Sequence, residues 1–280
     1  MSSVDTHIVT ELTRVGEAAE DGIDLARTAL AFAAYDEPHL DLSSYRRHLE
    51  LICLEVSAIA GHRPDRLADR IAALNDVIAK RFGYRGDSET YDDLDNANLA
   101  RVIDRRRGLP VALGILYATA ARAQGWRMVG INFPGHFLVR LDTGAERAII
   151  DPFARGQVRT AADLRGLLKA ALGSGAELNP DHYAPLSDRQ ILLRLRNNAK
   201  LRLLRDGQVE KAYRVLRSML LIAPQEASLW RESGLIQAHQ GNLVGAIEAL
   251  ETFVRMTPAS EASCGAINSM DRRTRYAFST

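Results

Sequence analysis

The sequence predicts an α+β protein that is predominantly helical, with one small antiparallel sheet. Three observations predict this class. Residues 111–122 are almost entirely apolar, which is typical of a buried helix. Three short apolar segments follow between residues 128 and 151, as expected for strands. Residues 1–95 and those after 187 instead show the apolar spacing of amphipathic helices.

The predicted central helix begins at Pro110, after Gly108 and Leu109. Proline fits the first turn of a helix because its missing N–H would have no intrahelical partner there. Gly125 is expected to end the helix. Because a helix that is apolar on nearly every face is buried on nearly every face, we expect this helix to form the core.

Three strands of an antiparallel meander are expected after this helix. Residues 128–133 form the first, and a bend at 134–135 leads to the second at 136–141. A turn at 142–144 precedes the third strand, which ends at Asp151. The pattern therefore places His136 at the start of one strand and Asp151 at the end of the next.

These motifs resemble the core of transglutaminase-like (papain-like) proteins, in which a cysteine opens a buried helix, a histidine opens a strand and an aspartate closes the next. Three segments are also similar to signatures of the SirB1 family of bacterial proteins, and the resemblance spans nearly the whole chain. The segments are Asp-Arg-Arg-Arg-Gly-Leu-Pro at 104–110, Asn-Phe-Pro-Gly-His-Phe-Leu-Val-Arg at 132–140 and Asp-Pro-Phe at 151–153. The resemblance implies a papain-like core.

The chain departs from the enzyme pattern at the nucleophile position, which falls on Pro110. Proline has no nucleophilic atom, so no thioester can form there. In a site of this kind the helix N-terminus would lower the pKa of a thiol. Cys53 continues an apolar helical stripe and is expected to be a small buried residue rather than a replacement nucleophile, and Cys264 lies outside the segment. The sequence therefore leans against an enzyme.

His136 and Asp151 remain as a vestigial dyad, with two interpretations. In the structural one, Asp151 orients His136 and both satisfy buried hydrogen bonds. In the functional one, the pair performs general acid–base work on some other chemistry. The structural interpretation is favoured because no partner nucleophile is visible.

A run of three arginines lies directly before the central helix. These side chains could bind a carboxylate or phosphate, or could lock Asp104 and nearby acids in place. Structural locking is favoured for at least one of them. The ligand-binding candidates are Arg105, Arg106, Arg107, Asn132 and His136.

Composition excludes several classes of protein. The 280 residues are 46% hydrophobic and 25% charged, with a net charge of +1, so nothing attracts the whole chain to nucleic acid or anionic membrane. Two widely separated cysteines fit a reducing cytoplasm, and no signal peptide or membrane span is expected.

No cofactor is implied by the sequence. The acidic residues at 87–98 are expected to form turns and caps rather than a metal site.

The C-terminal part contains an internal repeat of 34 residues, which relates Gly207 to Gly241 and Ala212 to Ala246. This period is typical of tetratricopeptide repeats. The four expected helices are 189–205, 208–222, 226–239 and 242–256. The predicted domains are a helical region at 1–95, the transglutaminase-like core at 96–186, two tetratricopeptide repeats at 187–258 and a tail at 259–280.

Two functions remain open. The first is a non-catalytic interaction or regulatory protein that docks a protein or peptide through its repeats. The alternative is a hydrolase or amidase that uses His136 and Asp151 with a non-cysteine nucleophile or water. Nucleic-acid binding is disfavoured because acids balance the arginines and no aromatic residues are interleaved with them. The arginines considered are Arg105, Arg106, Arg107, Arg194, Arg196, Arg202 and Arg205.

Overall fold

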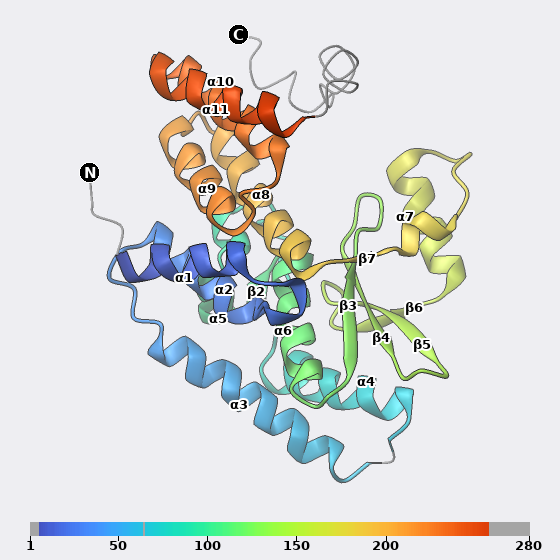
Figure 1. Ribbon diagram of the computed structural model, residues 1–280. Coiled ribbons are helices and arrows are strands. Elements are labelled where there is room, and N and C mark those ends of the chain that lie inside the picture. The colour runs from blue at the N-terminus through green and yellow to red at the C-terminus, as the bar shows by residue number, and fades with distance from the viewer. Residues whose placement is uncertain (1–5, 64, 258–280) are drawn as a thin grey trace. The chain divides into compact units, whose positions relative to one another are not determined.

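A computed structural model describes residues 6–63 and 65–257 of the chain (Figure 1). These residues form two compact units, one of residues 19–195 and one of residues 6–18 with 196–257. The division falls inside a helix, whereas the sequence places a boundary at 186–187. The expected tail at 259–280, with Cys264, lies outside the described residues, as do Pro64 and Pro258.

The unit of residues 19–195 is built around the predicted central helix, α6. Apart from Thr119 and Arg122, every residue of α6 is buried, which confirms the prediction from its apolar sequence. Gly125, with a φ of 72°, follows the end of this helix. The helices are α2 (Leu25–Asp36), α3 (Ser43–Ala60), α4 (Leu67–Asn75), α5 (Leu99–Arg105), α6 (Pro110–Arg122), α7 (Ala161–Leu172) and the first part of α8 (Asp188–Arg205).

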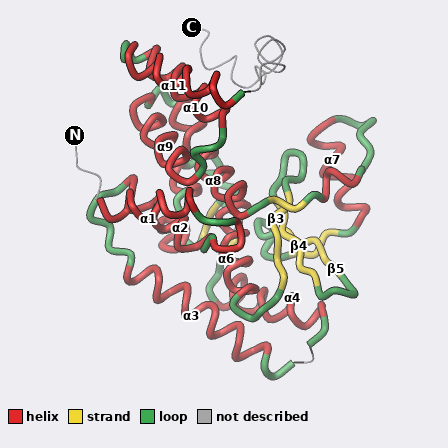
Figure 2. Tube along the Cα trace, viewed as in Figure 1, coloured by secondary structure: helices red, strands yellow, loops and turns green. Residues whose placement is uncertain are grey.

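A five-stranded antiparallel sheet packs against α6, which contacts β3 and β4 (Figure 2). The strand order is β6-β5-β4-β3-β7. The two outer strands were not predicted because they contain too few residues to show alternation. The strands are β3 (Arg127–Ile131), β4 (Leu138–Asp142), β5 (Arg147–Asp151), β6 (Gln157–Arg159) and β7 (Pro185–Leu186).

The sequence predicted that His136 begins a strand, but the strand starts two residues later, at Leu138. His136 closes a turn in which its N–H donates to the carbonyl of Phe133 at 2.9 Å. Gly135 takes a φ of 69° in this turn, a conformation that a glycine after Pro134 adopts without strain. The ladder between β4 and β3 starts only at Leu138, which pairs with Ile131. Asp151 is the last residue of β5, as expected.

A second sheet joins the two segments that precede α6. β1 (Arg85–Gly86) pairs in parallel with β2 (Arg107–Gly108). Between them lie a short helical turn, η3 (Leu94–Ala97), and α5. Before β1, α4 continues into a π-helical turn, η2 (Asp76–Arg81). This sheet was not predicted because strands of two residues carry no periodic signal.

The second unit contains the repeat helices. They are α9 (Val209–Ile222), α10 (Ala227–His239), α11 (Leu243–Met256) and the end of α8, close to the predicted bounds. Ala212 and Ala246, which the repeat relates, are both buried. The unit also includes α1 (Thr6–Glu17), which packs on α9. Within the described ranges, no helix is long and apolar enough to cross a membrane.

Candidate functional site

The imidazole of His136 is directed at the carboxylate of Asp151. Its Nε2 lies 3.0 Å from Oδ2 of Asp151, and its side chain is 21% exposed. Because Nε2 faces a carboxylate, it is the nitrogen that carries the proton in this pair. Nδ1 is then the nitrogen left for a second partner. The turn before β4 and the end of β5 therefore bring together the two predicted dyad residues, 15 positions apart in the chain.

Asp151 is the most heavily hydrogen-bonded group of the site and is only 1% exposed. Its Oδ2 also accepts from Nη2 of Arg159 at 2.6 Å, while Oδ1 accepts from the N–H groups of Phe153 at 3.0 Å and Ala154 at 3.2 Å. Burial alone would raise the pKa of Asp151, but hydrogen bonds from His136 and Arg159 outweigh it and lower that pKa. The carboxylate is therefore charged at neutral pH.

Two arginines around the dyad were not predicted as site residues. Arg159, from β6, forms the ion pair with Asp151. Arg194, from α8, donates to the backbone carbonyl of His136 at 3.1 Å, and its guanidinium carbon lies 5.6 Å from the centre of the Phe137 ring. Burial lowers the pKa of Arg194. Sequence alone could not find either contact, since both depend on the packing of separate elements.

Arg105 is held by acids of the segment before α5. Its guanidinium lies 3.1 Å from Asp87, 3.1 Å from Asp93 and 3.6 Å from Asp95. Burial alone would raise the pKa of Asp87, yet hydrogen bonds from Thr90 and the charge of Arg105 help lower it to about 2. Three of the acids for which a metal site was weighed thus face an arginine.

Arg106 ends α5 in the left-handed conformation, with a φ of 57°. Its guanidinium contacts the Tyr84 hydroxyl and lies 2.5 Å from Nε2 of His48. It also stacks over the Tyr84 ring at 4.9 Å. Burial, followed by the charge of Arg106, lowers the pKa of His48 to about 4. Burial raises the pKa of Tyr84 to about 12. The guanidinium of Arg106 is thereby held by contacts with His48 and Tyr84 inside the unit.

The other candidates lie nearer to solvent. Arg107 pairs with exposed Glu89 at 2.8 Å, and Asn132 is exposed after β3. Asp104 accepts from the Tyr45 hydroxyl at 3.0 Å rather than from the arginine run.

In the second unit, Arg196 and Arg202 are buried, and Arg196 donates to the hydroxyl of Ser218 at 2.9 Å. Ligand binding by Arg105, Arg106, Arg107, Asn132 and His136 stays a prediction.

A sequence model of the transglutaminase-like superfamily matches residues 43–197, more than half of the chain. The chain belongs to this superfamily. A model of the tetratricopeptide repeat matches residues 199–274. Both kinds of region were predicted from the sequence, but the first match begins well before the predicted core at 96–186 and the second ends within the predicted tail at 259–280.

Relatives of this transglutaminase-like protein occur in bacteria and in animals. A UPF0162 protein of Xylella fastidiosa is 29% identical over 251 residues, 86% of each chain. A UPF0162 protein of Vibrio cholerae is 29% identical over 87% of this chain and 90% of its own. Human F-box only protein 21 is 29% identical over 53% of this chain and only 24% of its own. A crystal structure of menin covers 88% of this chain and 69% of its own at 10% identity, with a TM-score of 0.38 that is too low to carry an argument.

In this transglutaminase-like core, the position that the resemblance gives to the nucleophile is filled by buried Pro110, the first residue of α6. Cys53 lies on α3, where its Sγ is 4.0 Å from the carbonyl of Thr119. Burial raises the pKa of the Cys53 thiol, so the reactive thiolate is disfavoured. The sequence predicted that Cys53 is buried, but in the structure it is only half-buried.

Proposed function

We propose that this protein is a non-catalytic member of the transglutaminase-like superfamily that acts by binding a protein or peptide partner, in an interaction or regulatory role. One feature of the first unit supports the absence of catalysis, because Pro110 offers no nucleophile. The hydrogen bonds of Asp151 to Arg159 and two backbone N–H groups give the aspartate a structural role as well. The finer assignment to the SirB1 branch rests on the sequence signatures, and a cytoplasmic location rests on cysteine spacing.

The observation that carries the binding proposal is a row of exposed apolar side chains on α11, which we call the α11 row. It consists of Leu243, Val244, Ile247 and Val254, which are 65%, 70%, 57% and 64% exposed. Their spacing of one, three and seven residues places them on neighbouring positions of one helix face. Exposed apolar side chains that gather on one helix face are typical of interaction sites, so the α11 row favours a docked partner.

A groove in the same unit offers a second contact surface. A cavity of about 600 Å³ is bounded by α1, α9, α10 and α11. Tyr213, Arg217 and Trp230 line it, and Nε1 of Trp230 donates to the carbonyl of Pro224 at 2.8 Å, which fixes the indole ring. Aromatic and arginine side chains are the residue types that contribute most energy at protein interfaces. This surface suits an extended peptide segment of the partner.

The experiment is affinity capture from an extract of the source organism with the full chain as bait. The test variant is Val244→Glu combined with Ile247→Glu, which places charge on the α11 row without disturbing a buried residue. The matched control is Leu54→Glu, because Leu54 is a 67% exposed apolar residue on α3. We expect a partner that the wild type and the control retain and the double variant loses.

Either of two results would overturn the proposal. In one, the double variant retains the same partner in the same amount as the wild type. In the other, the wild type retains no partner that the bare matrix lacks. Circular dichroism of the double variant checks that its helices are intact before the captures are compared.

A further inference from the structure

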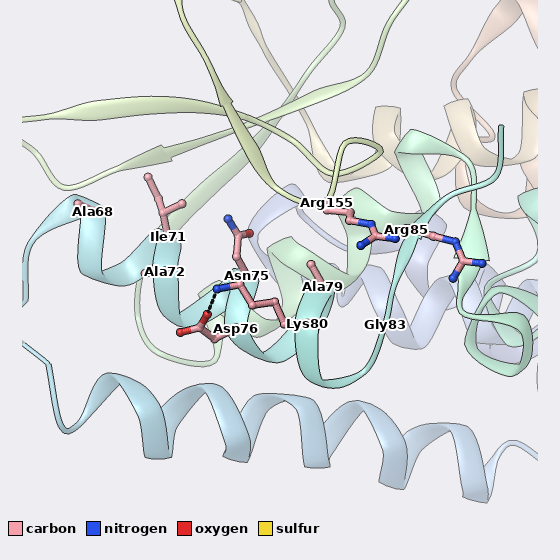
Figure 3. Close-up of a pocket in the computed structure, with 10 residues that line it drawn as sticks. All are labelled: Ala68, Ile71, Ala72, Asn75, Asp76, Ala79, Lys80, Gly83, Arg85 and Arg155. Atoms are coloured by element: carbon pink, nitrogen blue, oxygen red, sulfur yellow. Dashed lines mark ion pairs between the residues drawn. The ribbon is translucent and has the colours of Figure 1, made fainter.

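A cavity of about 770 Å³ in the unit of residues 19–195 has no role in the function proposed above (Figure 3). It lies between α4, η2, β1 and the loop of residues 152–156. Its volume is within the range of small-molecule sites, roughly 300–1,000 Å³. We call it the arginine pocket, because Arg85 and Arg155 line one end of it.

The acid of the arginine pocket is already neutralised. Asp76 lies 2.7 Å from Nζ of Lys80 and 2.5 Å from Nη2 of Arg63. Figure 3 shows the ion pair between Asp76 and Lys80 set apart from Arg85 and Arg155. Within residues 6–63 and 65–257, neither Arg85 nor Arg155 pairs with a carboxylate. The cavity is therefore lined by two arginines whose charges no carboxylate of the described residues compensates.

A neighbouring cavity of about 420 Å³ is also lined by Arg85 and Arg155. Its two acids are engaged elsewhere, since Asp87 pairs with Arg105 and Glu89 pairs with Arg107. No acid in this second cavity therefore offsets the two arginines. Two like charges that line one cavity repel each other, and a bound anion reduces that repulsion.

The backbone that carries Arg155 is fixed by the dyad aspartate. Arg155 adopts the left-handed region with a φ of 55°, a conformation that is unfavourable for a non-glycine residue. The N–H groups of Phe153 and Ala154 donate to the Asp151 side chain, and the N–H of Gly156 donates to the Asp151 carbonyl at 2.9 Å. The loop therefore presents Arg155 from a rigid base.

The backbone that carries Arg85 is fixed as well. Arg85 pairs with Arg107 across the parallel sheet, and its N–H donates to the carbonyl of Arg106 at 3.1 Å. The N–H of Gly86 donates to the carbonyl of Phe153 at 3.0 Å, which ties β1 to the loop of Arg155. Both arginines thus belong to one connected backbone frame, and a preorganised frame lowers the entropy lost when a ligand binds.

We propose that the arginine pocket binds the phosphate group of a small phosphorylated molecule. A phosphate monoester carries a charge of about −1.5 to −2 at pH 7, which matches two guanidinium groups, whereas a single carboxylate would leave one unpaired. Guanidinium groups bind phosphate through paired N–H donors. The volume beyond the arginines accommodates the rest of the molecule. This site is in a different unit from the α11 row, so either proposal can fail without the other.

Calorimetric titration of the full chain with phenyl phosphate tests the proposal. We expect saturable binding with a Kd of about 1 mM or lower at pH 7.5. Arg85→Gln and Arg155→Gln should each weaken it about tenfold, since each removes a charge-assisted hydrogen bond. The matched control is Arg147→Gln on β5, an exposed arginine outside the pocket, which should bind as the wild type does. Binding should also weaken below pH 6, where phosphate loses its second charge.

Three results would overturn the proposal. The first is no heat of binding at millimolar phenyl phosphate. The second is equal affinity for benzoate, which would show that a carboxylate suffices. The third is wild-type affinity in Arg155→Gln. Because Arg155 is exposed, its variant should fold normally, and it decides the question even if Arg85→Gln is misfolded.

Discussion

Oδ2 of Asp151 lies 3.0 Å from Nε2 of His136 and 2.6 Å from Nη2 of Arg159, so one carboxylate oxygen joins the turn before β4 to strand β6. The other oxygen caps the backbone of the loop that follows β5. Asp151 therefore has a structural task that does not depend on catalysis. This structural task explains why the histidine–aspartate hydrogen bond is present although Pro110 fills the position that the resemblance gives to the nucleophile.

Asp151→Asn should lower the free energy of unfolding by about 3 kcal/mol, because it leaves Arg159 without its buried counter-charge. His136→Ala should cost about 1 kcal/mol, since the ion pair with Arg159 persists. Urea denaturation at neutral pH measures both values. A cost for Asp151→Asn no larger than that for His136→Ala would contradict the structural role.

Gly156→Ala should be among the most damaging small substitutions in the chain. Gly156 has a φ of 76°, and an added Cβ would lie 1.8 Å from Oδ1 of Asn75 and 2.5 Å from the hydroxyl of Tyr117. The matched control is Gly144→Ala, which has a φ of 88° and open space around it. We expect a loss of about 1 kcal/mol for Gly144→Ala and at least about 3 kcal/mol for Gly156→Ala. Equal losses in thermal or urea unfolding would contradict the packing of this loop.

His48 should make stability depend on pH between about 6.5 and about 4. The folded pKa is depressed below the unfolded value of 6.5, so the unfolded chain binds more protons in this window. The stabilisation is present above pH 6.5 and is lost as the pH falls toward 4. The free energy of unfolding should therefore fall less steeply with decreasing pH in His48→Gln than in the wild type. Urea unfolding at a series of pH values measures this. The control, His62→Gln at an exposed position, should follow the wild type. If the free energy of unfolding of His48→Gln falls as steeply as that of the wild type, His48 is not the source of the pH dependence.

Periodic features could be predicted from the sequence. The apolar run after Pro110 predicts the buried helix α6, and the spacing from Gly207 to Gly241 predicts the repeat helices, because burial repeats with the helical or superhelical period. Short pairings could not be predicted. β1 and β7 contain two residues each, and their partners lie far along the chain. The association of α1 with the repeat unit likewise leaves no local signal.

The candidate site was predictable only in its motif residues. His136 and Asp151 were found because their spacing resembles a known core, and their hydrogen bond is present. Arg159 and Arg194 join them through tertiary packing, so no pattern near either residue indicates the contact. Arg85 and Arg155 were missed for the same reason, as 70 positions separate two residues that line one cavity.

The most direct test of the claim that this fold lacks catalysis is a turnover measurement on pooled peptide, amide and ester substrates. The purified wild type and His136→Ala are compared with buffer alone. Because Pro110 supplies no nucleophile, both proteins should match the buffer rate. Turnover by the wild type that disappears in His136→Ala would contradict the proposed function.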